Sequence, residues 1–166
     1  RFGLTVKCSV GALEDNNGSR VRNAEHLLDE VFLVVYGDNY WPIDLKKHME
    51  FYGKMGLPAM MTVYENSKGD GEYPKGNVGV KDGVVIHYEH YAAGDNPSFP
   101  GIDIGYSIIR KDLMRMMPEA DFEFQAEFLR PLIKKRMVSG FVTDNQYCTI
   151  TDMTCLKKAE IFLSKV

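Results

Sequence analysis

One carboxylate, Asp38, has the best position for chemistry in this sequence. It follows Gly37, directly after the apolar run of residues 31–36, which contains three valines. A short continuous apolar run is typical of a strand buried on both faces of a parallel sheet. Open α/β folds bind ligands at the carboxyl edge of such strands, so Asp38 could hold a metal ion beside a phosphorylated substrate. The alternative is an ordinary turn, since Gly-Asp and Asp-Asn are common turn pairs.

Two other stretches carry polar residues next to predicted elements. Glu89 and His90 follow a predicted strand over residues 84–88, and a histidine is charged only part of the time near neutral pH. His87, Tyr88, His90 and Tyr91 could form an ordinary aromatic strand end. Asp152 precedes a predicted helix over residues 153–163 and could be its N-cap.

The elements around these residues alternate between strands and helices. Residues 4–10 have the period-two pattern of a strand with one buried face. Ser19 could cap a helix over residues 20–28, and the strand over residues 31–36 follows. A strand, a helix and a second strand in this order favour a parallel pair with a right-handed crossover.

The rest of the chain continues the alternation, interrupted once by a hairpin in which Asp82-Gly83 forms the turn. His48 lies on the apolar face of a predicted helix and is interpreted as a packed histidine. Pro131 predicts a break inside a helix. The predicted elements are a helix over 44–54 capped by Asp44, strands over 59–64, 77–80, 84–88 and 102–109, helices over 110–116 and 124–135, strands over 139–142 and 147–151, and a helix over 153–163. The pattern predicts a single α/β domain over residues 1–166 with a mostly parallel sheet.

The composition excludes several classes of protein. The chain has 166 residues, of which 45% are hydrophobic and 26% charged, with a net charge of −3, as expected for a globular domain. No basic stripe indicates nucleic-acid binding, and no apolar run reaches the ~20 residues needed to span a bilayer. The three cysteines have no metal-site spacing, so we expect reduced thiols and a cytoplasmic protein.

Taken in order, the segments resemble the second two-thirds of a sugar-1-phosphate nucleotidylyltransferase. No single motif carries the resemblance; the order and spacing of the motifs do. The matching segments are residues 22–29, 32–38, 76–78 with 82–85, 102–107, 122–129 and 140–144. The resemblance implies a three-layer, Rossmann-like nucleotide-diphospho-sugar transferase fold of the GT-A kind.

The resemblance also implies an activity. Members of the family transfer a nucleoside monophosphate from a nucleoside triphosphate to a sugar 1-phosphate and release pyrophosphate, with Mg²⁺ as cofactor. Hard oxygen ligands suit Mg²⁺, which takes one or two carboxylates together with phosphate oxygens. The implied roles are metal ligand for Asp38 and Asp152, sugar contact for Asn77, Glu89 and Gly105, and sugar-phosphate contact for His90. Many members of the family self-associate, which leaves a homo-oligomer open.

The sequence also departs from the family pattern. The N-terminal Gly-rich loop that cradles the triphosphate is absent, and the chain opens on Arg1 one step before a predicted strand, as if cut from a longer protein. No acid directly follows Tyr147, and His90 stands where the family has a lysine. We therefore expect little activity from the chain alone. The alternative is a non-catalytic relative of the same fold that binds a sugar phosphate or nucleotide, or serves as a scaffold. A glycosyltransferase ranks last, because Asn39 and Tyr40 follow Asp38 in place of an Asp-x-Asp motif.

Overall fold

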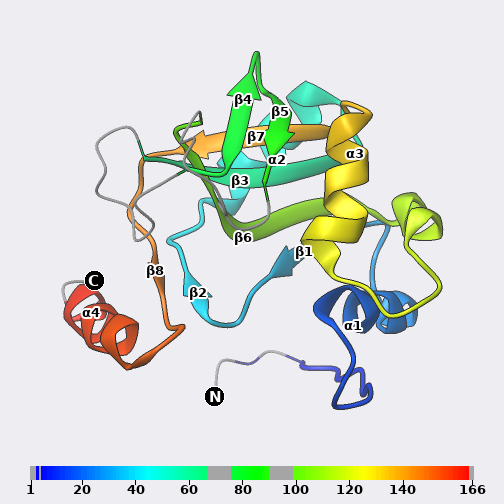
Figure 1. Cartoon of the computed structure of the whole chain (residues 1–166), viewed down its shortest axis with the longest axis horizontal. Helices are drawn as coiled ribbons and strands as arrows, with labels where there is room; N and C mark the ends of the chain where they lie inside the picture. Colours follow the sequence, from blue (N-terminus) through cyan, green and yellow to red (C-terminus); the bar gives the residue numbers. More distant parts are fainter. Residues whose placement is uncertain (1–2, 4, 67–75, 90–98, 165–166) are drawn as a thin grey trace.

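A computed structural model describes residues 3, 5–66, 76–89 and 99–164 of the chain (Figure 1). The strands are β1 (Val31–Val35), β2 (Asn39–Tyr40), β3 (Ala59–Glu65), β4 (Val78–Lys81), β5 (Val84–Tyr88), β6 (Gly101–Arg110), β7 (Val138–Thr143) and β8 (Cys148–Thr149). The helices are α1 (Asn17–Asn23), η1 (Glu25–Leu27), α2 (Leu45–Met55), η2 (Lys111–Met116), η3 (Phe124–Leu129), α3 (Arg130–Lys134) and α4 (Met153–Leu163). Within these ranges no helix is both long and apolar enough to cross a membrane.

The main sheet is mixed, so the prediction of a mostly parallel sheet is wrong. Its six strands lie in the order β1-β6-β3-β7-β5-β4, and a further contact joins β4 to β6. Only β3 and β7 pair in parallel; every other described pair in this sheet is antiparallel. The long strand β6 lies between β1 and β3 and is antiparallel to both. Strands β1 and β3 are therefore not neighbours, although the predicted parallel sheet would have paired them.

Strand β1 exists where it was predicted but is not buried on both faces. It pairs with β6 alone among the described strands, at one end of the sheet. Phe32 is 8% exposed, whereas Val31, Leu33 and Val35 are 37%, 36% and 44% exposed. An apolar run alone cannot distinguish a central strand from an edge strand, because the difference depends on which neighbours the fold supplies.

The chain before β1 also differs from the prediction. Residues 5–10 form no strand and are exposed. Helix α1 begins at Asn17, so Ser19 is not its cap; the Ser19 hydroxyl donates to Asp121 at 2.6 Å and accepts from the Phe122 amide at 3.2 Å. Gly18 packs directly under Phe122, where a β-carbon would overlap the ring. Helix α1 is therefore fixed to the segment before η3.

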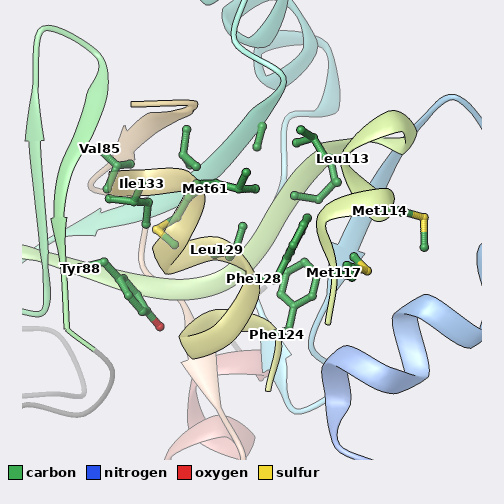
Figure 2. Packing of buried hydrophobic residues seen from close by; sticks show 14 of the residues in the cluster. Met61, Val85, Tyr88, Leu113, Met114, Met117, Phe124, Phe128, Leu129 and Ile133 are labelled. Atoms are coloured by element: carbon green, nitrogen blue, oxygen red, sulfur yellow. The ribbon is translucent and has the colours of Figure 1, made fainter. Parts of the chain in front are cut away.

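Two hydrophobic clusters cover the two faces of the sheet. Figure 2 shows the larger cluster, in which η3 and α3 pack their apolar side chains against the strands. Its members include Met61, Val85, Tyr88, Leu113, Phe124, Phe128, Leu129 and Ile133. The smaller cluster, Trp41, Tyr64, Ile102, Ile104, Tyr106 and Tyr147, uses the alternate residues of β3 and β6 and so lies on the other face.

Several local predictions are confirmed. Asp82 and Gly83 have φ angles of 51° and 75°, the left-handed backbone that a tight hairpin turn requires. Asp44 caps α2, and its side chain accepts the Lys47 amide at 3.1 Å. The predicted helix around Pro131 is interrupted, with a π-helical turn, η3, that ends immediately before α3 begins at Arg130.

Candidate functional site

The candidate site lies at the edge of the sheet where β1 and β3 end and β6 begins. The pairings Val35 with Tyr106 and Glu65 with Gly101 place the start of β6 between the ends of the other two strands. Asp38 follows β1 at this edge. Because β6 is antiparallel to β1 and β3, its first residues, 101–106, lie at the edge of the sheet where those two strands end.

The turn that carries Asp38 has a fixed backbone and an exposed carboxylate. The Asp38 carbonyl accepts the Ile150 amide at 2.8 Å, and Asn39 pairs with Thr149 in the small β2–β8 ribbon. Among the described residues, none forms a hydrogen bond or ion pair with the Asp38 carboxylate. The turn therefore presents this acid to solvent in a defined place, as a ligand-binding acid requires.

Strand β6 fastens the same turn from the other side. Asn39 donates through Nδ2 to the Ile104 carbonyl at 3.1 Å. The Tyr106 hydroxyl donates to the Asn39 carbonyl at 3.2 Å and accepts the Trp41 amide at 3.0 Å. Burial raises the pKa of Tyr106, which keeps this hydroxyl protonated as a donor. The β2–β8 ribbon and strand β6 together therefore fix the position of Asp38.

Gly105 allows β6 to approach this turn closely. Its φ is +75°, and an added β-carbon would lie 2.7 Å from Nδ2 of Asn39 and 3.3 Å from Cβ of Tyr36. The Gly105 carbonyl accepts the Tyr36 amide at 3.2 Å. Any side chain here would combine backbone strain with a clash, so the residue predicted to contact the sugar also has a structural reason to be glycine.

Asp103 links the predicted sugar-contact residues, and sequence reasoning did not single it out. Its Oδ1 accepts the Gly105 amide at 2.9 Å, and its Oδ2 accepts the Tyr88 hydroxyl at 3.3 Å. Its own amide donates to Oδ1 of Asn77 at 3.1 Å. Burial, with the nearby Asp103 charge, raises the pKa of Tyr88 far above its ordinary value. An acid inside an otherwise apolar strand was the signal that could have identified it.

Asn77 and Glu89 lie together where the hairpin meets β6. The Asn77 amide donates to the Gly101 carbonyl at 2.7 Å, and the Glu89 amide donates to the Asn77 carbonyl at 2.9 Å. Glu89 is exposed, with Oε1 3.1 Å from Nε2 of His87. The structure therefore brings Asn77, Glu89 and Gly105 into one hydrogen-bonded network, whereas His90 lies outside the described residues.

Asp152 is placed as a helix cap. Its Oδ1 accepts the Thr154 amide at 2.7 Å and the Cys155 amide at 2.8 Å, and these bonds hold its pKa below the ordinary value. It lies two residues beyond Ile150, which contacts the Asp38 backbone. The contacts support the cap interpretation, and a metal role for Asp152 stays a prediction. In the part of the chain that the structure describes, no three His, Cys, Asp or Glu side chains gather in a metal-binding group.

Asn17 ties the first helix to the candidate site. Its Oδ1 accepts the Phe124 amide at 2.8 Å, and its Nδ2 donates to the Tyr36 hydroxyl at 3.0 Å. Tyr36 lies between β1 and Asp38, so this contact links α1 to the end of β1. Neither residue was a candidate from the sequence.

Comparison with known proteins shows the fold. No protein-family model matches the chain, and no curated protein matches it. Among solved structures, HddC from Yersinia pseudotuberculosis is similar with a TM-score of 0.70 at 23% identity, over 89% of this chain and 62% of that one. A putative glucose-1-phosphate thymidylyltransferase from Bacillus anthracis, in complex with a sucrose, has a TM-score of 0.74 at 12% identity, over 92% of this chain and 63% of that one. An apo UDP-glucose pyrophosphorylase has a TM-score of 0.67 at 16% identity, over 93% of this chain and 62% of that one. The chain thus has the α/β fold of these proteins and spans less than two thirds of their length.

Proposed function

We propose that this chain supplies the sugar-phosphate and metal side of a sugar-1-phosphate nucleotidylyltransferase site. The reaction would transfer a nucleoside monophosphate from a nucleoside triphosphate to a sugar 1-phosphate and release pyrophosphate. Two structures with this fold are named for such chemistry, as a glucose-1-phosphate thymidylyltransferase and a UDP-glucose pyrophosphorylase. A further structure, of HddC, contains GMP-PN. A shared fold alone does not establish an activity, so the proposal depends on the site.

The observation that carries the proposal is the hydrogen-bonded network centred on Asp103. It joins Asn77 and Gly105, and Tyr36 joins Gly105 to the turn that carries Asp38. Displacement at phosphorus depends mostly on positioning and on charge neutralisation, so a rigid frame around one exposed acid suits this chemistry. Asp103, whose oxygens accept protein donors, serves as a positioning residue.

The donors fit a magnesium ion. Mg²⁺ takes one or two carboxylates and completes its shell with phosphate oxygens and water, and Asp38 offers one exposed carboxylate of this kind. Bound there, the ion would neutralise the charge of the phosphates and orient them. Asp152 would join Asp38 only if its second oxygen turned toward the ion while the first remained on the helix amides.

The sugar would contact the hairpin side of the network. The Oδ1 atom of Asn77 is committed to Asp103, but its Nδ2 atom forms no hydrogen bond with a described residue, so it can donate to a sugar hydroxyl. Glu89 can accept from a second hydroxyl. His90, next along the chain, would contact the sugar phosphate as a hydrogen-bond donor.

Replacement of Asp38 by asparagine is expected to weaken Mg²⁺-dependent binding of a nucleotide sugar at least about tenfold, because the variant keeps the shape but loses the charge. Calorimetric titration of the 166-residue chain with UDP-, dTDP- and GDP-sugars, with and without Mg²⁺, measures this effect. Asp29→Asn is the matched control: Asp29 is also exposed and lies just before β1, at the end opposite to Asp38.

The outcomes separate the two functions. Mg²⁺-dependent binding that is lost in Asp38→Asn and kept in Asp29→Asn supports the nucleotidylyltransferase site. Binding that is the same with and without Mg²⁺ and is unchanged in Asp38→Asn favours the non-catalytic relative. Failure of every nucleotide sugar to bind a folded chain would reject the proposal.

A further inference from the structure

His87 and Glu89 form a contact on the hairpin side of the candidate site. Nε2 of His87 lies 3.1 Å from Oε1 of Glu89, the distance of an ion pair. The Nε2 atom is buried, and no described residue forms a well-directed hydrogen bond with it. Because a buried N–H without a hydrogen bond is unfavourable, the exposed Glu89 side chain is expected to turn its carboxylate into line with this nitrogen.

A β-bulge in β5 places these two side chains on the same face of the hairpin. The register of β4 with β5 shifts by one residue at Ile86, which has no partner of its own. As a result Val85 and Tyr88, three positions apart, both pack in the larger cluster. His87 and Glu89, on either side of Tyr88, therefore lie on the opposite face.

Phe99 and Gly79 fix the imidazole ring of His87. The ring of Phe99 stacks on it, with centroids 4.1 Å apart and an interplanar angle of 20°. Gly79, directly opposite His87 in the hairpin, leaves the space for this stack, since an added β-carbon would lie 2.5 Å from Cδ1 of Phe99. Packing thus holds His87, whereas the Glu89 carboxylate has no partner other than His87 among the described residues.

The contact adds little to the stability of the fold. The side chains of His87 and Glu89 are 34% and 52% exposed, and an ion pair that solvent reaches to this extent is largely screened. Its main effect is therefore on the position of the carboxylate. A carboxylate that is already restrained loses less conformational entropy when a ligand binds, so the restraint favours binding.

We propose that His87 is a positioning residue that holds the Glu89 carboxylate in place for a sugar hydroxyl. With Oε1 beside His87, Oε2 of Glu89 has no described partner and can accept one hydroxyl. Nδ2 of Asn77, whose carbonyl accepts the Glu89 amide at 2.9 Å, can donate to the same sugar. A hydroxyl both donates and accepts, so this acceptor and this donor suit a sugar ring. The inference rests on the proposed function, in which Glu89 contacts the sugar.

Two substitutions at His87 separate the hydrogen-bond donor from the aromatic ring. His87→Phe keeps a ring against Phe99 but removes the donor, whereas His87→Gln keeps a donor near the position of Nε2. In calorimetric titrations with UDP-, dTDP- and GDP-sugars in the presence of Mg²⁺, His87→Phe is expected to weaken binding about fivefold. The affinity of His87→Gln should stay within about twofold of that of the unmodified chain.

His26→Phe is the matched control. It makes the same replacement at an exposed histidine of η1, which is not part of the network, and should leave the affinity unchanged. Urea unfolding of His87→Phe should match that of the unmodified chain, because the stack on Phe99 is kept. A loss of affinity without a loss of stability separates positioning from a structural role.

A double-mutant cycle tests whether His87 acts through Glu89. Glu89→Ala removes the carboxylate, so His87→Phe should cost no further affinity in that background. If His87 instead contacted the ligand itself, the losses from the two substitutions would add.

Additive losses in the double mutant would therefore overturn the inference. Equal affinity of the unmodified chain and His87→Phe would also overturn it, and would leave the proposed function intact. A loss in His87→Gln as large as that in His87→Phe would show that the donor is not the cause, and would overturn it as well. If the unmodified chain binds no nucleotide sugar, the proposed function itself fails, and the role of the pair fails with it.

Discussion

Phe128→Ala is expected to lower the free energy of unfolding by about 3–5 kcal/mol, the usual cost of emptying a buried aromatic site. Phe128 is 1% exposed and lies 5.3 Å, centroid to centroid, from Phe124 in the larger cluster (Figure 2). It comes from the π-helical turn η3, whose backbone is held by the helix α3 that follows, so the cavity cannot collapse easily. Urea unfolding followed by circular dichroism measures the loss.

Ile161→Ala is the control, because Ile161 is 61% exposed on α4. Its effect should stay within about 0.5 kcal/mol. If Phe128→Ala cost less than about 1 kcal/mol, η3 and α3 would not pack on the sheet as described.

The second large effect depends on pH and arises at His48. As predicted, this histidine is packed: it is fully buried, and its ring stacks on Phe141 with centroids 4.4 Å apart. Nε2 lies 2.7 Å from Oγ1 of Thr62, which fixes α2 to β3. Burial lowers the pKa of His48 from 6.5 to about 4, because the charged ring would lose its hydration.

The direction of the pH effect follows from proton binding. Between pH 6.5 and pH 4 the unfolded chain protonates His48 while the folded chain does not, so acid stabilises the unfolded state. The stability from the neutral ring is complete above pH 6.5 and declines as the pH falls toward 4. The whole effect is about 3 kcal/mol, of which about 2 kcal/mol is lost between pH 7 and pH 5.

Urea unfolding at pH 7 and pH 5 measures this loss. His48→Gln retains a hydrogen-bonding group but does not titrate, so its free energy of unfolding should change about 2 kcal/mol less between the two pH values than that of the unmodified chain. His26→Gln is the matched control, since His26 is exposed whereas His48 is buried. An equal pH dependence in the chain and in His48→Gln would show that the buried ring is not the cause.

Local signals explain which elements could be predicted from the sequence. The Asp82-Gly83 turn supplies left-handed backbone for its own hairpin, Asp44 caps its own helix, and Pro131 interrupts its own segment. Each signal acts within a few residues, so no knowledge of the remaining chain is needed.

The order of the strands could not be predicted in the same way. The apolar run at β1 gave a strand correctly, but β6 lies between β1 and β3, and its partnership depends on residues about seventy positions away. Residues 5–10 have a strand pattern but no strand beside them in the described chain. The hydrophobic pattern of a strand indicates which of its faces is buried, but it does not indicate which element buries that face.

The residues of the candidate site also divide into those that could be predicted from the sequence and those that could not. Asn77, Glu89 and Gly105 were chosen through a family resemblance, and the structure joins them in one network. Asp103, at the centre of that network, was passed over because its strand was interpreted as core. Its carboxylate is acceptable there because donors such as Gly105 and Tyr88 reach it, and the Tyr88 contact exists only after the hairpin docks on β6.

A titration followed by amide NMR tests the central claim most directly. UDP-, dTDP- and GDP-sugars are added in turn, with Mg²⁺, to ¹⁵N-labelled chain. We expect at least one of them to shift the amides of Asn39, Asn77, Asp103 and Gly105 together, with smaller changes in α4. The shifts at Asn39 should require Mg²⁺ and disappear in Asp38→Asn. If the amide signals of this sheet edge do not shift at saturating ligand, or if the shifts occur elsewhere, the nucleotide-sugar site does not lie at this edge of the sheet.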